Sequence, residues 1–332
     1  MRLVTIDDFR DIYFKMKQRG FNFILSKLHP FGQARTKYAY NQQNALVSEW
    51  HIIPQVIKRK NKLITGNENV DYNEYLMTEI FAGKSNLRLL SLGSGTSNRE
   101  IRLASYPNFS EIVCVDIAKN QLNKAKEIAL KNNLNNIRFV CADIDEYLKD
   151  KRSNFDIVLF NQSLHHFKNV DFLISHQIFG VLKNGGNLII NEYVGKNRLQ
   201  YSSEQIKAIN EALKLIPDKY KKIFGTNITK KKFYGLGLLR MIIADPSECI
   251  DSKSILPAIH SSFKTVIEKP YGGNIIMGTL KNIAHNFLTS DSDMGKEHIL
   301  DALFAFEDDY LKKNQSDFIF GVYEKPPQSS TA

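Results

Sequence analysis

The segment LLSLGSGTSNRE (89–100) ends an apolar run at two closely spaced glycines, Gly93 and Gly95. A strand that ends in Gly-x-Gly lets backbone N–H groups approach a ligand closely, with the N-terminus of a helix behind them. A dinucleotide site also needs a third glycine three residues after the second, where this chain has Asn98. The loop therefore predicts a nucleotide-type site without the pyrophosphate fingerprint of an NAD enzyme.

Two aspartates follow this loop, each at the end of a β-rich run. Asp116 ends EIVCVD, and an acid there can accept hydrogen bonds from both hydroxyls of an adenosine ribose. The less favoured alternative is that Asp116 caps the helix that follows it. Asp143 ends IRFVCAD, where a carboxylate can accept from an adenine amino group while Ile144 covers the ring. The pair indicates an adenosine-containing cofactor.

Two further polar segments offer groups for proton transfer or substrate binding. His165 and His166 follow the run FDIVLF, and histidine is the natural general base for a hydroxyl acceptor near neutral pH. Neighbouring loop residues point in different directions, so we expect His165 to face the substrate, unless both only hold the loop. In NEYVGKNR, Glu192 could act as a base or bind an amine, and Arg198 could bind an anionic group through two hydrogen bonds.

These side chains fall at the ends of regularly alternating elements. Amphipathic helical stretches separate short β-rich runs at 87–92, 111–117, 137–143, 155–161 and 187–194. Continuous apolar strands that alternate with such helices predict a parallel sheet covered on both faces. Right-handed crossovers then bring the carboxyl ends of the strands to one edge, where open α/β sheets bind ligands.

The flanking segments are predicted to surround this sheet. Residues 1–86 form a mostly helical N-terminal cap or lid, and 87–325 form the main domain. Two late strands are expected at 263–273 and 317–325, with a Gly-Gly turn directly before the fifth strand. The segments 195–262 and 274–316 are expected to add walls to a substrate pocket, and the tail 326–332 to be disordered.

The N-terminal 28 residues contain mixed charges and no long apolar stretch, which excludes a signal peptide or a membrane span there. Phe9, Ile12, Tyr13 and Met16 recur at helical spacing. We expect that amphipathic helix to dock on the body of the protein, with a membrane surface as the alternative.

Composition is that of an ordinary globular protein, with 43% hydrophobic and 24% charged residues among 332. The three cysteines form no metal-binding cluster, so no metal is predicted. Cys114 and Cys141 fall in strand-like runs and are expected to be buried thiols, which favours a reducing, cytoplasmic setting. The net charge of +10 lacks an arginine-rich, aromatic-interleaved patch, so nucleic acid is not the expected partner.

Taken jointly, five segments resemble the class I, Rossmann-like S-adenosylmethionine-dependent methyltransferases, in family order and spacing: LLSLGSGTS, VCVDIA, VCADIDEY, FDIVLFNQSLHHF and LKNGGNLIINEYV. The resemblance covers residues 85–195 well. It implies a doubly wound α/β fold with a mostly parallel seven-stranded sheet of order 3-2-1-4-5-7-6, its last strand antiparallel. The family often has an acid where this chain has Ser91, and a third glycine at Ser97. Asn98 or Glu100 could compensate for the missing acid.

The resemblance also implies S-adenosylmethionine as cofactor and a role for each matching residue. Contacts are implied for the methionine part at Gly93, Ser94, Gly95 and Thr96, for the ribose at Asp116 and Ile117, for the adenine at Asp143 and Ile144, and for the amino-acid portion at Asn161 and Gln162. The stretch NEYVGKNRLQ is similar to stretches in methyltransferases of glycan or secondary-metabolite pathways, which implies substrate contacts at Tyr193 and Arg198.

We therefore expect methyl transfer to a hydroxyl or amine of a small molecule. An RNA or protein methyltransferase that uses the lysines of 218–232 is one alternative, although the fourth strand lacks the Asn/Asp-Pro-Pro-aromatic signature of amino-adenine methylation. A catalytically silent partner subunit is another. An NAD-dependent oxidoreductase is disfavoured by the missing glycine and by Asp143. The oligomeric state stays open, with a homodimer allowed.

Overall fold

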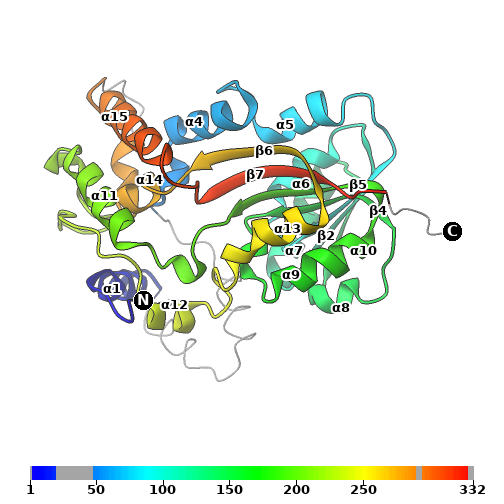
Figure 1. The fold of residues 1–332 in the computed structure, drawn as a ribbon, viewed down its shortest axis with the longest axis horizontal. Coiled ribbons are helices and arrows are strands. Elements are labelled where there is room, and N and C mark those ends of the chain that lie inside the picture. Colours follow the sequence, from blue (N-terminus) through cyan, green and yellow to red (C-terminus); the bar gives the residue numbers. More distant parts are fainter. Residues whose placement is uncertain (1, 20–47, 289–293, 328–332) are drawn as a thin grey trace.

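The computed structural model describes residues 2–19, 48–288 and 294–327. The predicted disordered tail lies almost entirely outside the described residues, as do the side chains of Tyr13 and Met16. The chain forms a seven-stranded sheet flanked by helices (Figure 1).

The sheet has the order β3-β2-β1-β4-β5-β7-β6, as the resemblance implies. Strands β1 to β5 pair in parallel, and β7 pairs antiparallel with both β5 and β6. The strand bounds are β1 Leu87–Leu92, β2 Phe109–Asp116, β3 Ile137–Cys141, β4 Phe155–Asn161, β5 Leu182–Tyr193, β6 Lys264–Gly272 and β7 Phe318–Glu324. The predicted doubly wound α/β fold class is confirmed.

Helices cover both faces of this sheet. Their bounds are α1 Ile6–Arg19, α4 Pro54–Thr65, α5 Tyr72–Tyr75, α6 Asn98–Ala104, α7 Lys119–Lys131, α8 Ile144–Leu148, α9 Val170–Phe172, α10 Phe179–Val181, α11 Ser203–Lys214, α12 Leu238–Ala244, α13 Ile255–Ser262, α14 Ile276–Leu280 and α15 Met294–Leu311. In Figure 1, α4 and α5 lie on one side of the sheet, and α9, α10 and α13 on the other.

Alternation along the strands divides the core in two. Leu89 and Ile112 face one hydrophobic cluster, whereas their chain neighbours Leu90 and Val113 face the other. Successive side chains of a strand point to opposite faces, so an apolar run buries both faces at once. This explains why the central strands read as continuous apolar runs rather than as alternating ones.

Two local predictions need correction. The Gly-Gly pair does not precede the fifth strand but lies within β5, where Gly185 has a φ of +73° and the register with β4 is irregular. Cys114 is buried as predicted, but Cys141 is exposed. It ends β3, which is the edge strand of the sheet and is only partly covered.

Helix α1 docks through its acidic face rather than through its apolar one. Asp8 is 2% exposed, and its carboxylate accepts hydrogen bonds from the backbone N–H of Gly237 (2.9 Å) and from Nε of Arg240 (3.1 Å). Phe9 is 67% exposed and Ile12 is 38% exposed. The expectation that this helix docks on the protein body is confirmed, but its described contacts come from its acids and not from Phe9 or Ile12. Among the described residues, no helix is both long and apolar enough to cross a membrane.

The orientation of α1 can be tested by its stability. Replacing Asp8 with Ala should lower the free energy of unfolding by about 3 kcal/mol, because the backbone N–H of Gly237 loses its acceptor and Arg240 keeps only its ion pair with Asp11. Replacing the neighbouring Phe9 with Ser should change it by less than about 0.5 kcal/mol. Chemical denaturation measures both values. A larger loss for the Phe9 variant than for the Asp8 variant would contradict the acidic docking face.

Candidate active site

The glycine loop follows β1 and adopts a backbone that favours glycine. Gly93 and Gly95 have φ values of +70° and +53°. A Cβ atom added at Gly93 would lie 2.7 Å from Cβ of Ser163, so only glycine lets the loop after β4 approach this closely. Ser97 also has a left-handed backbone (φ +52°), and its hydroxyl donates to Oγ of Ser94 at 3.0 Å. Ser97 thus occupies a conformation in which glycine is the commoner residue.

A buried carboxylate lies where the sequence lacks the expected strand acid. Ser91 is 1% exposed, and its hydroxyl donates to Oε1 of Glu100 at 2.7 Å. Glu100 lies in the first turn of α6, is 2% exposed, and burial raises the pKa of its carboxyl group. Of the two residues considered as compensation for Ser91, Glu100 is the one whose side chain contacts it, whereas Asn98 is exposed.

Asp116 ends β2 directly beside the glycine loop. Its carboxylate accepts a hydrogen bond from the backbone N–H of Gly95 at 2.8 Å and another from Ala118 at 2.7 Å. Each carboxylate oxygen keeps a second lone pair that could accept a ribose hydroxyl. The next residue, Ile117, is half-buried. Thr96, on the other side of the loop, is exposed.

Asp143 follows β3 and caps α8. Its Oδ1 accepts from the backbone N–H groups of Asp145 (2.9 Å) and Glu146 (3.4 Å). Oδ2 is not used in these cap bonds and could still accept from an adenine amino group. The neighbouring Ile144 is buried. The adenosine roles of Asp116, Asp143 and their neighbours stay predictions.

A hydrogen-bonded network joins the carboxyl ends of β4 and β5. Oδ1 of Asn161 accepts from the hydroxyl of Tyr72 (2.6 Å) and from the side-chain amide of Asn191 (2.7 Å). Asn191 in turn accepts from the hydroxyl of Tyr271 at 2.7 Å. Gln162 donates to the backbone oxygen of Asn191 through both its backbone and side-chain nitrogens, each at 2.9 Å. The network ties cap helix α5 and strand β6 to the predicted cofactor-binding residues.

Glu192 is hydrogen-bonded to the loop after β4 that carries His165 and His166, here called the histidine loop. Glu192 is 0% exposed, and Oε2 lies 2.6 Å from Nδ1 of His165. Its other oxygen accepts from the backbone N–H groups of Ser163 (2.5 Å) and Leu164 (2.8 Å). Glu192 was predicted to act as a base or to bind an amine. The structure places it under His165, as a residue that orients the imidazole.

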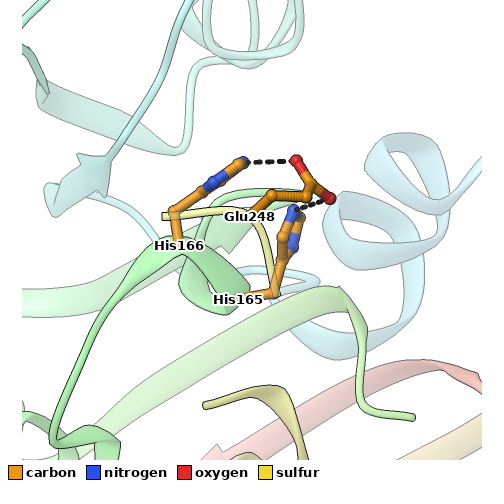
Figure 2. A group of neighbouring side chains, drawn as sticks. All are labelled: His165, His166 and Glu248. Atoms are coloured by element: carbon orange, nitrogen blue, oxygen red, sulfur yellow. Dashed lines mark ion pairs between the residues drawn. The ribbon is translucent and has the colours of Figure 1, made fainter. Parts of the chain in front are cut away.

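The two histidines lie side by side and face one carboxylate (Figure 2). Nε2 of His165 is 3.9 Å from one oxygen of Glu248, and Nε2 of His166 is 3.8 Å from the other. Burial acts to lower the pKa of His165, but the carboxylates of Glu192, Glu248 and Asp245 together outweigh it, so that this pKa is raised. Burial and the neighbouring His165 lower the pKa of His166.

The same cluster is able to hold a metal ion. Donor atoms of His165, His166 and Glu248 all lie within 4.8 Å of one another. Both Nδ1 atoms have second partners, Glu192 for His165 and Ser247 for His166 (3.2 Å), as imidazole ligands of metals usually do. An ion at Nε2 of His165 and a proton at the same atom exclude each other. Sequence spacing gave no sign of this cluster, because Glu248 is remote in the chain.

A cavity of about 620 Å³ opens in front of these groups. That volume suits a small-molecule ligand. Its lining comes from the cap, from the ends of β4 to β6 and from the two added segments, and includes Trp50, Asn161, Gln162, His165, Tyr193, Leu199, Glu248, Tyr271, Met277 and Phe318.

The two predicted substrate contacts are placed differently. Tyr193 lines the cavity, and its hydroxyl donates to the backbone oxygen of Lys196 at 3.1 Å. Arg198 is not among the lining residues, and its guanidinium donates to the backbone oxygens of Pro246 (2.7 Å) and Glu248 (3.0 Å). Arg198 thus holds the segment that carries Glu248 and is not directed at a substrate anion.

Charged or aromatic side chains that line the cavity without a role predicted from the sequence include Lys60, Arg99, Arg102, Glu248 and Tyr271. One of them has a sequence signal. Lys60 continues the buried stripe of Val56 and Ile64 at four-residue spacing, so α4 turns it inward. A lysine on the apolar face of a helix indicates that its side chain is turned toward the body of the protein and not toward solvent.

The dependence of His165 on Glu192 can be measured directly. Replacing Glu192 with Gln should lower the pKa of His165, because the neutral amide no longer stabilises the imidazolium. An NMR titration of the imidazole ring reports this pKa. Glu127→Gln, an exposed change on α7, is the control and should leave it unaltered. An unchanged titration in the Glu192 variant would show that this carboxylate does not govern His165.

Residues 83–238 match a protein family described as a methyltransferase domain. The chain is also 31% identical, over 129 residues, to demethylmenaquinone methyltransferases from two strains of Leptospira interrogans, Fiocruz L1-130 and Lai 56601. The aligned part is 38% of this chain, and the chain spans about half (50%) of the length of these curated relatives.

Solved structures with a similar chain path include two methyltransferases. The geranyl diphosphate C-methyltransferase from Streptomyces coelicolor A3(2) is 12% identical with a TM-score of 0.48, over 90% of this chain and 99% of that chain. Phosphoethanolamine N-methyltransferase 2 from Haemonchus contortus is 17% identical with a TM-score of 0.47, over 91% of this chain and 59% of that chain.

The sheet order, the glycine loop and the match to the family agree with one another. Residues 83–238 are thus similar to a methyltransferase domain, in a sheet with the order that the resemblance to class I S-adenosylmethionine-dependent methyltransferases implies.

Proposed function

We propose that the protein transfers a methyl group from S-adenosylmethionine to a hydroxyl or amine of a small molecule. One observation carries the proposal: the histidine loop after β4 packs on the glycine loop at Gly93 and also lines the cavity through His165. A cofactor on the first loop and an acceptor in the cavity would therefore meet at the end of β4. This proximity is what a transfer between two bound molecules requires.

The residues of the glycine loop fit the cofactor. Gly93 and Gly95 let the loop pack closely against Ser163 and Gln121 in a left-handed backbone, and Asp116 still offers acceptor lone pairs beside them. The buried Glu100 supplies a carboxyl group near the place where the family often has a strand acid. When bound, S-adenosylmethionine supplies a methyl group already activated by its sulfonium for in-line displacement.

The part left to the protein is to align the acceptor and to receive its proton. Because a carboxylate only accepts hydrogen bonds, Glu192 keeps the proton of neutral His165 on Nδ1. Nε2 then faces the cavity with a free lone pair, directed toward the Glu248 side. We assign His165 as the general base and Glu192 as the residue that positions it.

The shape of the cavity supports a small acceptor, such as a sugar, a glycan precursor or a secondary metabolite. The cap and the two added segments all contribute lining residues, here represented by Trp50, Leu199 and Met277. The three cysteines are free, which supports a reducing, cytoplasmic setting as part of this proposal.

The alternative of an RNA or protein acceptor finds less support in the basic segment 218–232. Lys230 is buried, and its ammonium group donates to the backbone oxygens of Gly278, Thr279 and Lys281 at 2.7 to 3.0 Å. Lys221 and Lys231 both pair with Asp218. These lysines are engaged within the protein, which leaves less positive charge for a polyanion.

Binding experiments test the cofactor. Isothermal calorimetry should detect S-adenosylhomocysteine but not NADH. Asp116→Ala and Glu100→Gln should each weaken this binding by about 10-fold or more, equivalent to roughly 1.4 kcal/mol, through loss of a ribose acceptor and of a buried carboxyl group. The exposed change Glu127→Gln is the control. Binding of NADH alone would overturn the assignment, and unaltered affinity in the Asp116 variant would refute its ribose contact.

Turnover tests the base. His165→Ala should lower methyl transfer about 100-fold or more while leaving the affinity for S-adenosylhomocysteine unchanged, because general base catalysis contributes on that order. Release of S-adenosylhomocysteine with a panel of hydroxyl and amine acceptors is the measurement. His176→Ala is the control, because His176 is exposed and lies in the helical segment Leu173–Ile178. Equal turnover in the His165 variant would reduce that residue to a structural one, and no turnover by the unaltered protein would favour a silent partner subunit.

A further inference from the structure

Two cations line the cavity without a carboxylate partner. Lys60 of α4 and Arg99 of α6 are absent from the ion pairs formed among the described residues, although both border the 620 Å³ space. The nearby Arg102 differs from them, because it pairs with Asp71 at 2.6 Å. Lys60 and Arg99 therefore bring positive charge to the cavity without an ion-paired carboxylate, with Asp71 and Glu100 acting on them at longer range.

Aromatic rings hold these two cations in place. The ammonium nitrogen of Lys60 lies 5.4 Å from the ring centre of Tyr72 and 4.9 Å from that of Tyr271. The guanidinium carbon of Arg99 lies 4.2 Å from the same Tyr72 ring. Cations at such distances gain a modest attraction from the ring. Both charges thus share the Tyr72 ring, and their positions are determined before any ligand binds.

Contacts with aromatic rings do not replace the hydrogen bonds that a cation makes with water. Burial, and secondarily the charge of Arg99, lower the pKa of Lys60 to about 7. Lys60 itself is half-buried, whereas two described lysines that are buried are hydrogen-bonded to the backbone: Lys230 donates to three backbone oxygens and Lys325 to two. Hydrogen bonds of this kind are the usual requirement for burying an ammonium group. Among the hydrogen bonds of the described residues, none involves the ammonium group of Lys60. Its N–H donors are therefore available to an anionic ligand.

We propose that Lys60 and Arg99 bind an anionic group, a carboxylate or a phosphate, carried by the methyl acceptor. This inference rests on the proposed function, since it names the class of acceptor for the same cavity. Two cations near one ring can contact one tetrahedral or planar anion together, and such charge-assisted hydrogen bonds are the strong ones.

Lys60 lies between the rings of Tyr72 and Tyr271, in the cavity that His165 also lines. Because Tyr72 also donates to Asn161, which is predicted to border the amino-acid portion of the cofactor, the cofactor carboxylate is the competing source of the anion, and the measurements below distinguish the two. His165 and Glu248 lie on the same cavity. An acceptor anchored at Lys60 would therefore extend its nucleophile toward His165.

Inorganic phosphate and pyrophosphate are the probes for this site, because no acceptor is needed to use them. Calorimetry on the full chain should detect pyrophosphate binding, and Lys60→Met or Arg99→Met should weaken it at least 10-fold. Methionine retains the length and packing of the side chain but removes the charge. Lys58→Met is the control on the same helix, because Lys58 is exposed and pairs with Glu68. It should leave the affinity unaltered.

Two further measurements separate the possible failures. Thermal unfolding of the Lys60 variant should be unchanged or shifted upward, since a charge without an ion-paired carboxylate is removed, whereas a purely structural lysine would lower it. Absence of phosphate and pyrophosphate binding to the unaltered protein overturns the proposal. So does a Lys60→Met variant that loses affinity for S-adenosylhomocysteine in parallel, because the anion would then be the cofactor carboxylate. Failure of S-adenosylhomocysteine to bind the unaltered protein refutes the proposed function instead.

Discussion

The site depends most on the burial of one carboxylate, that of Glu192, at the end of β5. Because its two oxygens accept from an imidazole and from two backbone N–H groups, it joins β5 to the loop after β4. That loop touches Gly93 through Ser163 and borders the cavity through His165. A buried charge is tolerated only when its lone pairs are satisfied, so the loop has little freedom to move. The geometry between cofactor loop and cavity follows from this single constraint.

Sequence patterns were sufficient for the scaffold because strand and helix periods are local. The runs that became β1 and β4 were predicted with their observed bounds, and the resemblance implied the sheet order. Errors arose where the local pattern was ambiguous about partners. The apolar stripe of α1 is real, yet the acids on its other face found donors at Gly237 and Arg240. Tertiary pairing of charge thus decided which face was buried.

For the site, the sequence indicated which residue types lie near the cavity, but not what each side chain contacts. His165 does line the cavity, but Glu192 is hydrogen-bonded to the imidazole of His165, and Arg198 is hydrogen-bonded to the backbone of the segment that carries Glu248. Such roles depend on which backbone groups lie near a side chain in the folded protein, and the spacing of residues in the sequence does not indicate these contacts. The contact between Ser91 and Glu100 has the same origin, because a strand residue and a helix residue meet only once the loop has folded.

The hydroxyl of Tyr72 gives the cap a consequence of its own. Tyr72 belongs to the short helix α5, yet its hydrogen bond ends on Asn161 of the sheet, and its ring carries both cavity cations. Displacement of α5 would break that bond and remove the ring that both cations contact, although Lys60 belongs to α4 and Arg99 to α6. One aromatic residue therefore couples two helices of the cap and one of the main domain to the end of β4, so a substitution at Tyr72 would act on the sheet and on both cations together.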